Sequence, residues 1–380
     1  MVPSSLTLML KYGNPIRLLR QNGRVTVRIA QIAPLHEAVP PKFYGGTERV
    51  VSYLTEALVE QGHDVTLFAS GDSRTSARLE AAWPRALRLD PSIRDWVAPH
   101  QLLLDKVRRV AHEFDVLHFH LDYLPFALFS QLDTPFVTTL HGRLDLMELQ
   151  AIFDHFSQAP VISISDSQRQ PLPQANWLST IYHGLPKNLL TPRPNTKPEY
   201  LAFLGRICPE KRADHAIRIA AEAGLPLKIA AKVDKVDREY FEKQIEPLLK
   251  SADVEFIGEI TEAQKPEFLS GARALLFPID WSEPFGLVMI ESMACGTPVI
   301  AFNRGSVPEV IEHGVTGFIC EDVHCAVDAL QRLNELSRDE IRAQFVRRFT
   351  SETMAQNYID SYSELLRKAK RPILHSVSAR

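Results

Sequence analysis

The sequence predicts an α/β protein built from two doubly wound domains, each with a parallel sheet. The chain has 380 residues, which is long for a single ordinary core. Short apolar segments alternate with helical segments along most of it, a pattern that favours parallel strands joined by crossover helices. Between two runs of this alternation, residues 191–198 carry three prolines and no apolar periodicity, as expected of a linker.

The first run begins with a buried strand expected at 25–33, followed by a loop rich in proline and glycine and then a helix. The apolar residues Val50, Leu54 and Leu58 recur at helical spacing, and Gly62 suits the position after the helix end. The helix is therefore expected over residues 47–61. Further strands of this run are expected at 63–69, 115–120, 136–140, 161–165 and 180–183.

The second run follows the linker directly and ends in a helical tail, where Met354, Tyr358 and Tyr362 lie four residues apart. Because doubly wound sheets bind ligands beyond the carboxyl ends of their strands, we expect the site in a cleft between the domains. Strands are expected at 200–205, 227–233, 254–258, 274–278, 298–302 and 317–320, with helices over 287–294 and 351–368. The expected units are a basic leader (1–26), an N-terminal domain (27–190), the linker (191–198), a C-terminal domain (199–348), and a C-terminal helix and tail (349–380) packing back on the N-terminal domain.

Composition narrows the function classes. A net charge of -3 gives no electrostatic reason to expect nucleic acid as a partner. The four cysteines show no CxxC spacing, which argues against a zinc or redox motif, and their scarcity fits a cytoplasmic location. No apolar run approaches the length of a membrane helix.

The leader at 1–26 is basic, but its short apolar piece precedes the charges, the wrong order for a secretory signal. We expect this leader to be disordered or a wrongly assigned start. A peripheral contact with a membrane surface is an alternative that the sequence does not favour.

Two glutamates lie eight residues apart in the second run. Glu283 stands in a loop, and Glu291 lies one turn into the helix that starts at Leu287. The backbone N–H groups from Gly286 to Val288 have no partner within a helix and would face an anion or a hydroxyl group. Either glutamate alone is more simply structural, since an acidic residue in a first turn favours the helix dipole. Together they favour a polyhydroxylated, anionic ligand.

This segment resembles the signature of the retaining glycosyltransferases of family 4, which have the GT-B fold of two Rossmann-like domains. In that signature two glutamates are separated by seven residues, Phe-Gly follows the first, and Gly-Thr-Pro-Val follows the second. The chain has Glu283, Phe285-Gly286, Glu291 and Gly296-Thr297-Pro298-Val299 in those places. The resemblance implies that Glu291 holds ribose hydroxyls of a nucleotide donor. It also implies that Glu283, with the backbone from Phe285 to Leu287, holds hydroxyls of the transferred sugar.

Two cations follow the first strand of the second run. Arg206 and Lys211 lie beyond a strand end and a glycine turn, where they could cradle a diphosphate, although surface cations are usually only solvated. Family members carry an Arg and a Lys at this spacing, which implies that both neutralise the leaving nucleotide diphosphate. The chain departs from the family at Arg212, where the family usually has glycine.

A Gly-Gly pair, Gly45-Gly46, separates the first strand from the first helix. Glycines there either let the backbone approach a ligand or form a tight turn with Thr47 as the helix cap. The family uses this loop against the donor phosphates and the acceptor, which implies that both glycines bind the donor. Thr47 and Glu48 are further candidates, and Gly258, at the end of an expected strand, is a candidate for contact with the base.

Histidines lie within or directly after several expected strands of the first run. His118 and His120 straddle one residue and point the same way, as two metal ligands would. Because no acidic cluster completes a metal site, we expect them to line the cleft or to satisfy core hydrogen bonds. The family commonly has His-Gly at the place of His141, near the transferred sugar, which implies a catalytic role for His141. His183 also recurs in the family and is a further candidate.

No Asp-x-Asp pair occurs in the sequence, so Arg206 and Lys211 are expected to take the place of a metal ion. The resemblance implies a hexosyltransferase that needs no metal and no cofactor, and that retains the anomeric configuration by same-face attack. His141 and Glu283 join the two cations as the expected catalytic residues. A nucleotide-sugar donor is expected, with a UDP-sugar favoured over a GDP-sugar. The acceptor is a hydroxyl of an unidentified saccharide, lipid-linked molecule or small molecule.

Other interpretations stay open. A nucleotide-sugar epimerase should lack the Glu-Phe-Gly signature, and an α-glucan phosphorylase needs pyridoxal phosphate and a longer chain. A dehydrogenase is disfavoured because no GxGxxG follows the first strand. The alternative from another class is a catalytically silent protein that binds sugar nucleotides. Every expected donor position is filled, so we favour an active enzyme.

Overall fold

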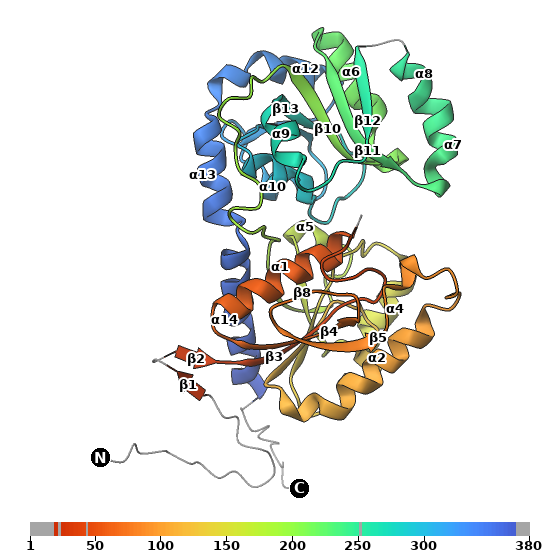
Figure 1. The fold of residues 1–380 in the computed structure, drawn as a ribbon, viewed down its shortest axis with the longest axis vertical. Helices are drawn as coiled ribbons and strands as arrows, with labels where there is room; N and C mark the ends of the chain where they lie inside the picture. The colour runs from red at the N-terminus through yellow and green to blue at the C-terminus, as the bar shows by residue number, and fades with distance from the viewer. Residues whose placement is uncertain (1–18, 22–23, 43–44, 251–252, 370–380) are drawn as a thin grey trace, which may run out of the picture.

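The computed structural model describes residues 19–21, 24–42, 45–250 and 253–369. These residues form two α/β domains stacked along the long axis of the molecule (Figure 1), each centred on one parallel sheet. The predicted architecture, two doubly wound α/β domains, is confirmed.

The N-terminal sheet contains seven parallel strands among the described residues, in the order β5-β4-β3-β6-β7-β8-β9. Strand β3 has β4 on one side and β6 on the other, so the winding reverses there and the carboxyl ends beside it are where a ligand is expected. The strands are β3 (Arg28–Ile32), β4 (Asp64–Ser70), β5 (Arg78–Trp83), β6 (Val116–Phe119), β7 (Phe136–Thr139), β8 (Pro160–Ser163) and β9 (Asn176–Thr180). Its helices are α1 (Gly46–Glu60), α2 (Val97–Val110), α3 (Phe126–Phe129), α4 (Met147–His155) and α5 (Asp166–Arg169).

Several elements of this domain differ from the prediction. The strand expected at 25–33 is divided: β2 (Arg24–Thr26) pairs antiparallel with β1 (Leu19–Gln21), and β3 then enters the main sheet. Strand β9 ends at Thr180, so the strand predicted at 180–183 was placed too late in the sequence. Strand β5 was not predicted, because its half-buried residues alternate too weakly to give a period of two. The rest of the expected leader, residues 1–18 and 22–23, lies outside the described residues.

The C-terminal sheet has, within the described chain, six parallel strands in the order β12-β11-β10-β13-β14-β15. The winding reverses between β10 and β13, which places the carboxyl end of β10 beside that of β13. The strands are β10 (Tyr200–Ile207), β11 (Leu227–Val233), β12 (Val254–Gly258), β13 (Ala272–Phe277), β14 (Val299–Phe302) and β15 (Gly317–Cys320). Its helices are α6 (Ala213–Ala223), α7 (Arg238–Tyr240), α8 (Glu246–Leu249), α9 (Lys265–Ser270), α10 (Leu287–Ala294), α11 (Val307–Val310), α12 (Val323–Gln331) and α13 (Arg338–Arg348).

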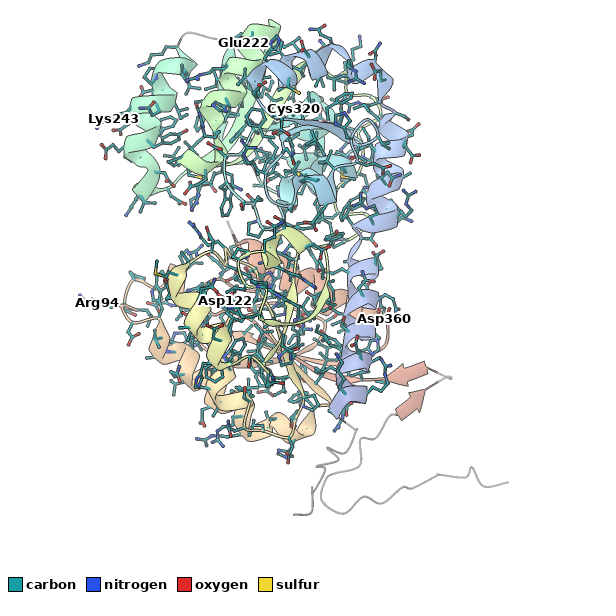
Figure 2. All side chains as sticks on the ribbon, turned by 180° about the vertical axis from the view of Figure 1, so that it is seen from behind. Arg94, Asp122, Glu222, Lys243, Cys320 and Asp360 are labelled. Carbon is teal, nitrogen blue, oxygen red and sulfur yellow. The ribbon has the colours of Figure 1, made fainter. Side chains whose placement is uncertain are left out.

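Helix α14 (Ser351–Ala369) leaves the C-terminal domain and packs against α1 of the N-terminal domain. Figure 2 shows this helix, marked by Asp360, running along the side of the N-terminal domain. Where the chain crosses back, the backbone of Leu185 donates to Phe349 O (2.9 Å) and accepts from Ser351 N (2.8 Å). The two chain segments between the domains are therefore bonded to each other.

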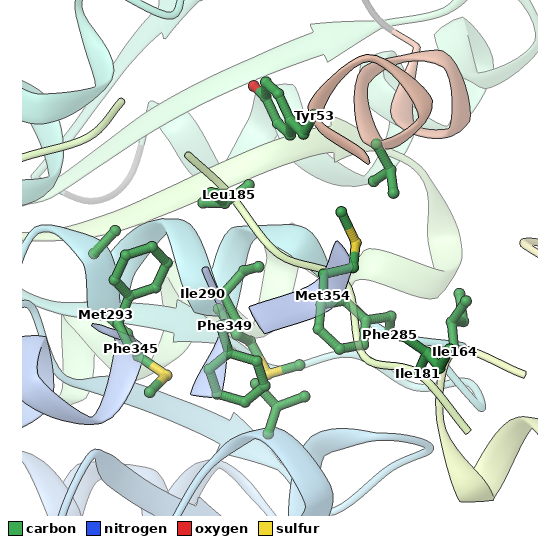
Figure 3. Packing of buried hydrophobic residues seen from close by; sticks show 14 of the residues in the cluster. Tyr53, Ile164, Ile181, Leu185, Phe285, Ile290, Met293, Phe345, Phe349 and Met354 are labelled. Carbon is green, nitrogen blue, oxygen red and sulfur yellow. The ribbon is translucent and has the colours of Figure 1, made fainter. Parts of the chain in front are cut away.

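A cluster of buried apolar residues continues through both domains at this crossing (Figure 3). Leu185, Phe349 and Met354 belong to the crossing itself, and Phe285 comes from the loop before α10. All four side chains are almost fully excluded from solvent. The apolar contact between the domains therefore includes Phe285, which belongs to the loop predicted to bind the donor (residues 283–287, the donor loop). Among the described residues, no helix combines the length and apolar character needed to span a membrane.

Candidate active site

The loop between β13 and α10 holds Glu283 in a backbone shape that depends on glycine. Gly286 caps α10 with a φ of 80°, in the left-handed region that side chains other than glycine rarely adopt. Gly305 has a φ of 55°, and a Cβ there would collide with the backbone of Glu283. Ser306 fixes the loop by donating from N to Glu283 O (3.0 Å) and from Oγ to Phe285 O (2.8 Å). The predicted Phe-Gly turn is thus clamped by the loop after β14.

The structure brings two predicted site residues, Lys211 and Glu283, into direct contact. Lys211 Nζ forms an ion pair with Glu283 Oε2, and the indole of Trp281 donates to the same oxygen (2.9 Å). The ammonium also lies 5.4 Å from the ring centroid of Phe277 and 5.3 Å from that of Trp281. Both charged side chains are largely buried, so each carries its charge in a confined, aromatic setting.

Glu291 lies one turn into α10 and belongs to a chain of charges that joins the two domains. Its Oε1 pairs with Lys265 Nζ (2.7 Å), and Lys265 also approaches Glu262 (3.4 Å). Glu262 in turn accepts from Arg49 Nη1 of α1 (2.7 Å). Burial alone lowers the pKa of Lys265, but the adjacent Glu291 and Glu262 outweigh it and raise that pKa. Sequence reasoning missed Lys265, Glu262 and Arg49, because no motif marks them and only the folded chain places them together.

Arg206 lies at the end of β10 and is turned toward β11. Its guanidinium is 3.6 Å from Asp234 and 3.9 Å from Asp237, and its side chain is 37% exposed. The structure therefore pairs Arg206 with acidic groups on the far side of the strand end, whereas Lys211 reaches Glu283. Gly258 ends β12 with a φ of 74°.

Arg212 shows how the departure from the family is accommodated. Its backbone is left-handed (φ 52°, ψ 52°), the conformation that explains why glycine is usual at this place. The guanidinium bonds to Asp214 (2.9 Å) and Asp280 (3.2 Å), which anchor the side chain. The loop shape that carries Lys211 is therefore kept without glycine.

The Gly-Gly loop ends at the start of α1. Gly45 is the N-cap and the helix begins at Gly46, so Thr47 lies within the first turn and the alternative of Thr47 as the cap is wrong. Glu48 is buried and accepts a hydrogen bond from the backbone N–H of Glu37 (3.3 Å), and burial raises its pKa. Glu48 thus supports the loop that follows β3.

The predicted histidines form a chain that ends at the donor loop. His120 Nδ1 lies 2.9 Å from His141 Nε2, and the ring of His141 stacks on His183 at 5.3 Å. His183 meets the ring of Phe285 edge-on at 4.9 Å. Burial lowers the pKa of His141 to about 3 and lowers the pKa values of the buried His118, His120 and His183 well below their usual range. The histidine cluster is therefore neutral at physiological pH.

The contacts of His118 and His120 separate the two roles expected of them. His118 bonds to Thr139 Oγ1 (2.8 Å) and to Tyr362 OH (2.7 Å), so it satisfies core hydrogen bonds, whereas His120 connects the core to His141. In the described part of the chain, no three His, Cys, Asp or Glu side chains are placed to hold a metal ion.

The sequence matches two protein-family models that together span most of the chain. The model described as Glycosyltransferase Family 4 matches residues 44–210. The model described as Glycosyl transferases group 1 matches residues 191–354. These matches, together with the two α/β domains, identify the protein as a glycosyltransferase of the GT-B fold. Within that class, the chain belongs to the glycosyltransferases of family 4.

Similar proteins agree with this assignment, and solved structures share the fold. The chain is 27% identical over 375 residues to N-acetyl-alpha-D-glucosaminyl L-malate synthase of Bacillus anthracis, covering 86% of this chain and 96% of that protein. It is 26% identical over 365 residues to phosphatidyl-myo-inositol mannosyltransferase of Mycolicibacterium smegmatis, covering 85% and 88%. A glycosyltransferase involved in avilamycin A biosynthesis superimposes with a TM-score of 0.68 at 23% identity, covering 90% and 98%. HepE of Anabaena, solved with UDP and glucose, gives 0.67 at 19% identity, covering 89% and 99%.

Proposed function

We propose that the protein transfers a hexose from a nucleoside diphosphate sugar, a UDP-sugar in preference to a GDP-sugar, to an acceptor hydroxyl. The transfer retains the anomeric configuration and needs neither a metal ion nor a cofactor. The observation that carries the proposal is the contact between Lys211 and Glu283 at the start of α10, with Glu291 one turn further on. This arrangement offers a cation for a diphosphate, and carboxylates for hydroxyl groups on either side of it.

Each group has a part in this proposal. Glu291 holds the ribose, Glu283 accepts hydrogen bonds from the transferred sugar, and the N–H groups from Gly286 to Val288 face the diphosphate. Lys211, in its confined setting, and Arg206 stabilise the charge that develops on the leaving diphosphate. Gly45 and Gly46 bring the N-terminal domain against the donor phosphates.

The reaction proceeds on one face of the sugar. The acceptor oxygen bonds to the anomeric carbon on the side from which the diphosphate departs, and the bond between that carbon and the diphosphate oxygen breaks. Its electron pair leaves with the diphosphate, which takes the proton of the acceptor hydroxyl. A neutral His141 suits a contact with the uncharged sugar better than it suits stabilisation of the diphosphate, which is assigned to Lys211 and Arg206.

The preference for uridine draws on HepE, which was solved with UDP and with UDP-glucose, whereas starch synthase IV of Arabidopsis thaliana was solved with ADP and acarbose. A thermal-shift panel of UDP, GDP and ADP tests the base, since a ligand at a hundred times its Kd adds roughly 2.7 kcal/mol of stability. We place the reaction in the cytoplasm, because all four cysteines are free thiols that suit a reducing compartment.

The test of mechanism uses water as the acceptor. UDP-glucose is incubated with the protein in excess EDTA, and the first glucose anomer released is identified by NMR. Release of α-glucose, unaffected by EDTA, is the expected result. First release of β-glucose, or activity abolished by EDTA and restored by magnesium, contradicts the mechanism. A silent binding protein would be stabilised by UDP but would release no sugar. Glu291→Gln, which weakens the ribose contact, is the matched control for binding.

A further inference from the structure

A buried chain of hydrogen bonds leads from helix α14 to His141. Tyr362 OH lies 2.7 Å from His118 Nδ1, and the side-chain amide nitrogen of Gln31 donates to both of these atoms, at 3.2 Å and 3.3 Å. The side-chain oxygen of Gln31 (Oε1) lies 2.8 Å from His120 Nε2, and His120 Nδ1 lies 2.9 Å from His141 Nε2. Gln31, His118 and Tyr362 are fully buried, so water does not compete for these bonds.

The order of protons along this chain follows from its acceptors. A carbonyl oxygen only accepts, so the bond between His120 Nε2 and Gln31 Oε1 requires a proton on His120 Nε2. His120 is neutral because burial keeps its pKa well below the usual range, and its Nδ1 therefore carries a lone pair. The bond between His120 and His141 then requires the proton to lie on His141 Nε2. His141 is left with an unprotonated Nδ1.

The amide of Gln31 is oriented from the opposite end of the chain. Its nitrogen faces Tyr362 OH and His118 Nδ1, so its oxygen is directed at His120. Because an amide nitrogen only donates, its contact with His118 Nδ1 requires that nitrogen to be unprotonated, which places the proton of neutral His118 on Nε2, facing Thr139 Oγ1 (2.8 Å). Because Tyr362 belongs to α14, the helix that returns from the C-terminal domain helps to set the protonation pattern of the N-terminal histidines.

The unprotonated Nδ1 of His141 is a hydrogen-bond acceptor that a ligand could use. His141 Nδ1 is shielded from solvent and has no hydrogen-bond partner among the described residues. Its ring stacks on His183, which contacts Phe285 of the donor loop. An acceptor atom buried without a partner is unusual in native proteins. A hydroxyl group of the sugar, arriving at the donor loop, is a donor that would satisfy it.

We propose that Gln31 is a positioning residue for sugar transfer: through His120 it fixes the tautomer of His141 that offers Nδ1 as an acceptor to a sugar hydroxyl. Tyr362 holds Gln31 in the orientation that this requires. The functional half of the inference rests on the proposed transferase activity, whereas the tautomer itself is a property of the ligand-free protein.

The first test reads the ring protons directly. Full-length protein labelled with ¹⁵N-histidine is studied by long-range ¹H–¹⁵N NMR without ligand, with His141→Gln used to assign the signal. The expected result is a proton on His141 Nε2 in the wild type. Gln31→Met, of similar length but unable to accept, and the milder Tyr362→Phe should both shift His141 toward a mixture of tautomers. A proton on His141 Nδ1 in the wild type overturns the proposal even if neither variant folds.

The second test separates the sugar from the nucleotide. In Gln31→Met, release of glucose from UDP-glucose should slow by about two- to tenfold, the loss of one hydrogen bond, while the Kd for UDP stays unchanged. Thr138→Val is the matched control, because Thr138 Oγ1 is buried but takes no part in the chain. An equal loss of UDP binding, or no change in glucose release in a variant whose tautomer has shifted, refutes the positioning role. If the wild type neither binds UDP nor cleaves UDP-glucose, the proposed function fails, and the NMR result still decides the tautomer.

Discussion

Replacing Lys265 with methionine should destabilise the protein strongly, because it strands the carboxylate of Glu291. The Lys265 side chain is 14% exposed and that of Glu291 is 5% exposed, and their charged atoms lie 2.7 Å apart. Removing one partner of a buried ion pair typically costs about 3–5 kcal/mol, since the remaining charge is left desolvated. Replacing both charges with neutral groups of similar size is often close to neutral. Lys265→Met should therefore lose about 3–5 kcal/mol, and Lys265→Met with Glu291→Gln should recover most of that loss.

Urea unfolding followed by circular dichroism measures these free energies of unfolding. The matched control is Lys243→Met, at a lysine on the edge of the C-terminal domain (Figure 2). Lys243 pairs with Glu239, and their side chains are 69% and 77% exposed. That exposed pair should contribute less than about 1 kcal/mol. The reasoning is refuted if Lys265→Met is no more destabilising than Lys243→Met, or if the effects of Lys265→Met and Glu291→Gln simply add.

Two further predictions concern residues of the candidate site. Glu291→Ala and Lys211→Ala should each weaken UDP binding by roughly 1.5–3 kcal/mol, as expected for a hydrogen bond to a charged group, and wild-type affinity in calorimetry would contradict both assignments. Stability should fall in acid, because the pKa of His141 is about 3 in the folded protein and near 6.5 in the unfolded chain. The buried, neutral His141 therefore stabilises the folded protein fully above about pH 6.5, and this stabilisation is lost as pH falls toward 3. The free energy of unfolding should fall by up to ~1.4 kcal/mol per pH unit for each such histidine. Denaturation at pH 7, 6 and 5 can measure this.

The sequence predicted the α/β architecture and the start of helix α10, because both depend on local patterns. Helix α10 starts at Leu287 as predicted, with Glu283 in the loop before it and Glu291 one turn into it. The partners of these residues were not predictable. Lys265 and Trp281 have no signature in a single sequence, and they become recognisable only once the chain has brought them to Glu291 and Glu283.

The hydrogen bonds of the histidine chain could not be predicted from the sequence for the same reason. Gln31 is one polar residue in an apolar strand, and its partners Tyr362 and His118 lie 331 and 87 residues away in the chain. A buried amide in a strand is a weak signal that some partner must exist, because buried polar groups are nearly always hydrogen-bonded. Only the return of α14 identifies that partner.

The ion pair between Arg49 and Glu262 joins the two domains beside Glu291, the residue predicted to hold the ribose. Leu185 is bonded through its backbone to the crossing at Phe349, so these bonds can persist if the domains rotate about that point. The ion pair between Arg49 and Glu262 must break when the domains separate, and Glu262 also contacts Lys265, the partner of Glu291. Any ligand that binds better to the closed arrangement shifts the equilibrium toward it, and the reverse also holds.

Arg49→Leu should therefore weaken UDP binding, although Arg49 is not assigned to the nucleotide. The pair is about one-fifth to one-quarter exposed, so its loss should cost about 1 kcal/mol, equivalent to roughly a fivefold higher Kd in calorimetry. Arg85→Leu is the matched control, because Arg85 pairs with Asp90 (2.9 Å) within the N-terminal domain alone. Because the Arg49 pair is partly exposed, salt screens it, and the difference between the two variants should shrink as the salt concentration rises. Equal UDP affinity in Arg49→Leu, Arg85→Leu and the wild type at low salt would show that this ion pair does not couple the domains to the donor.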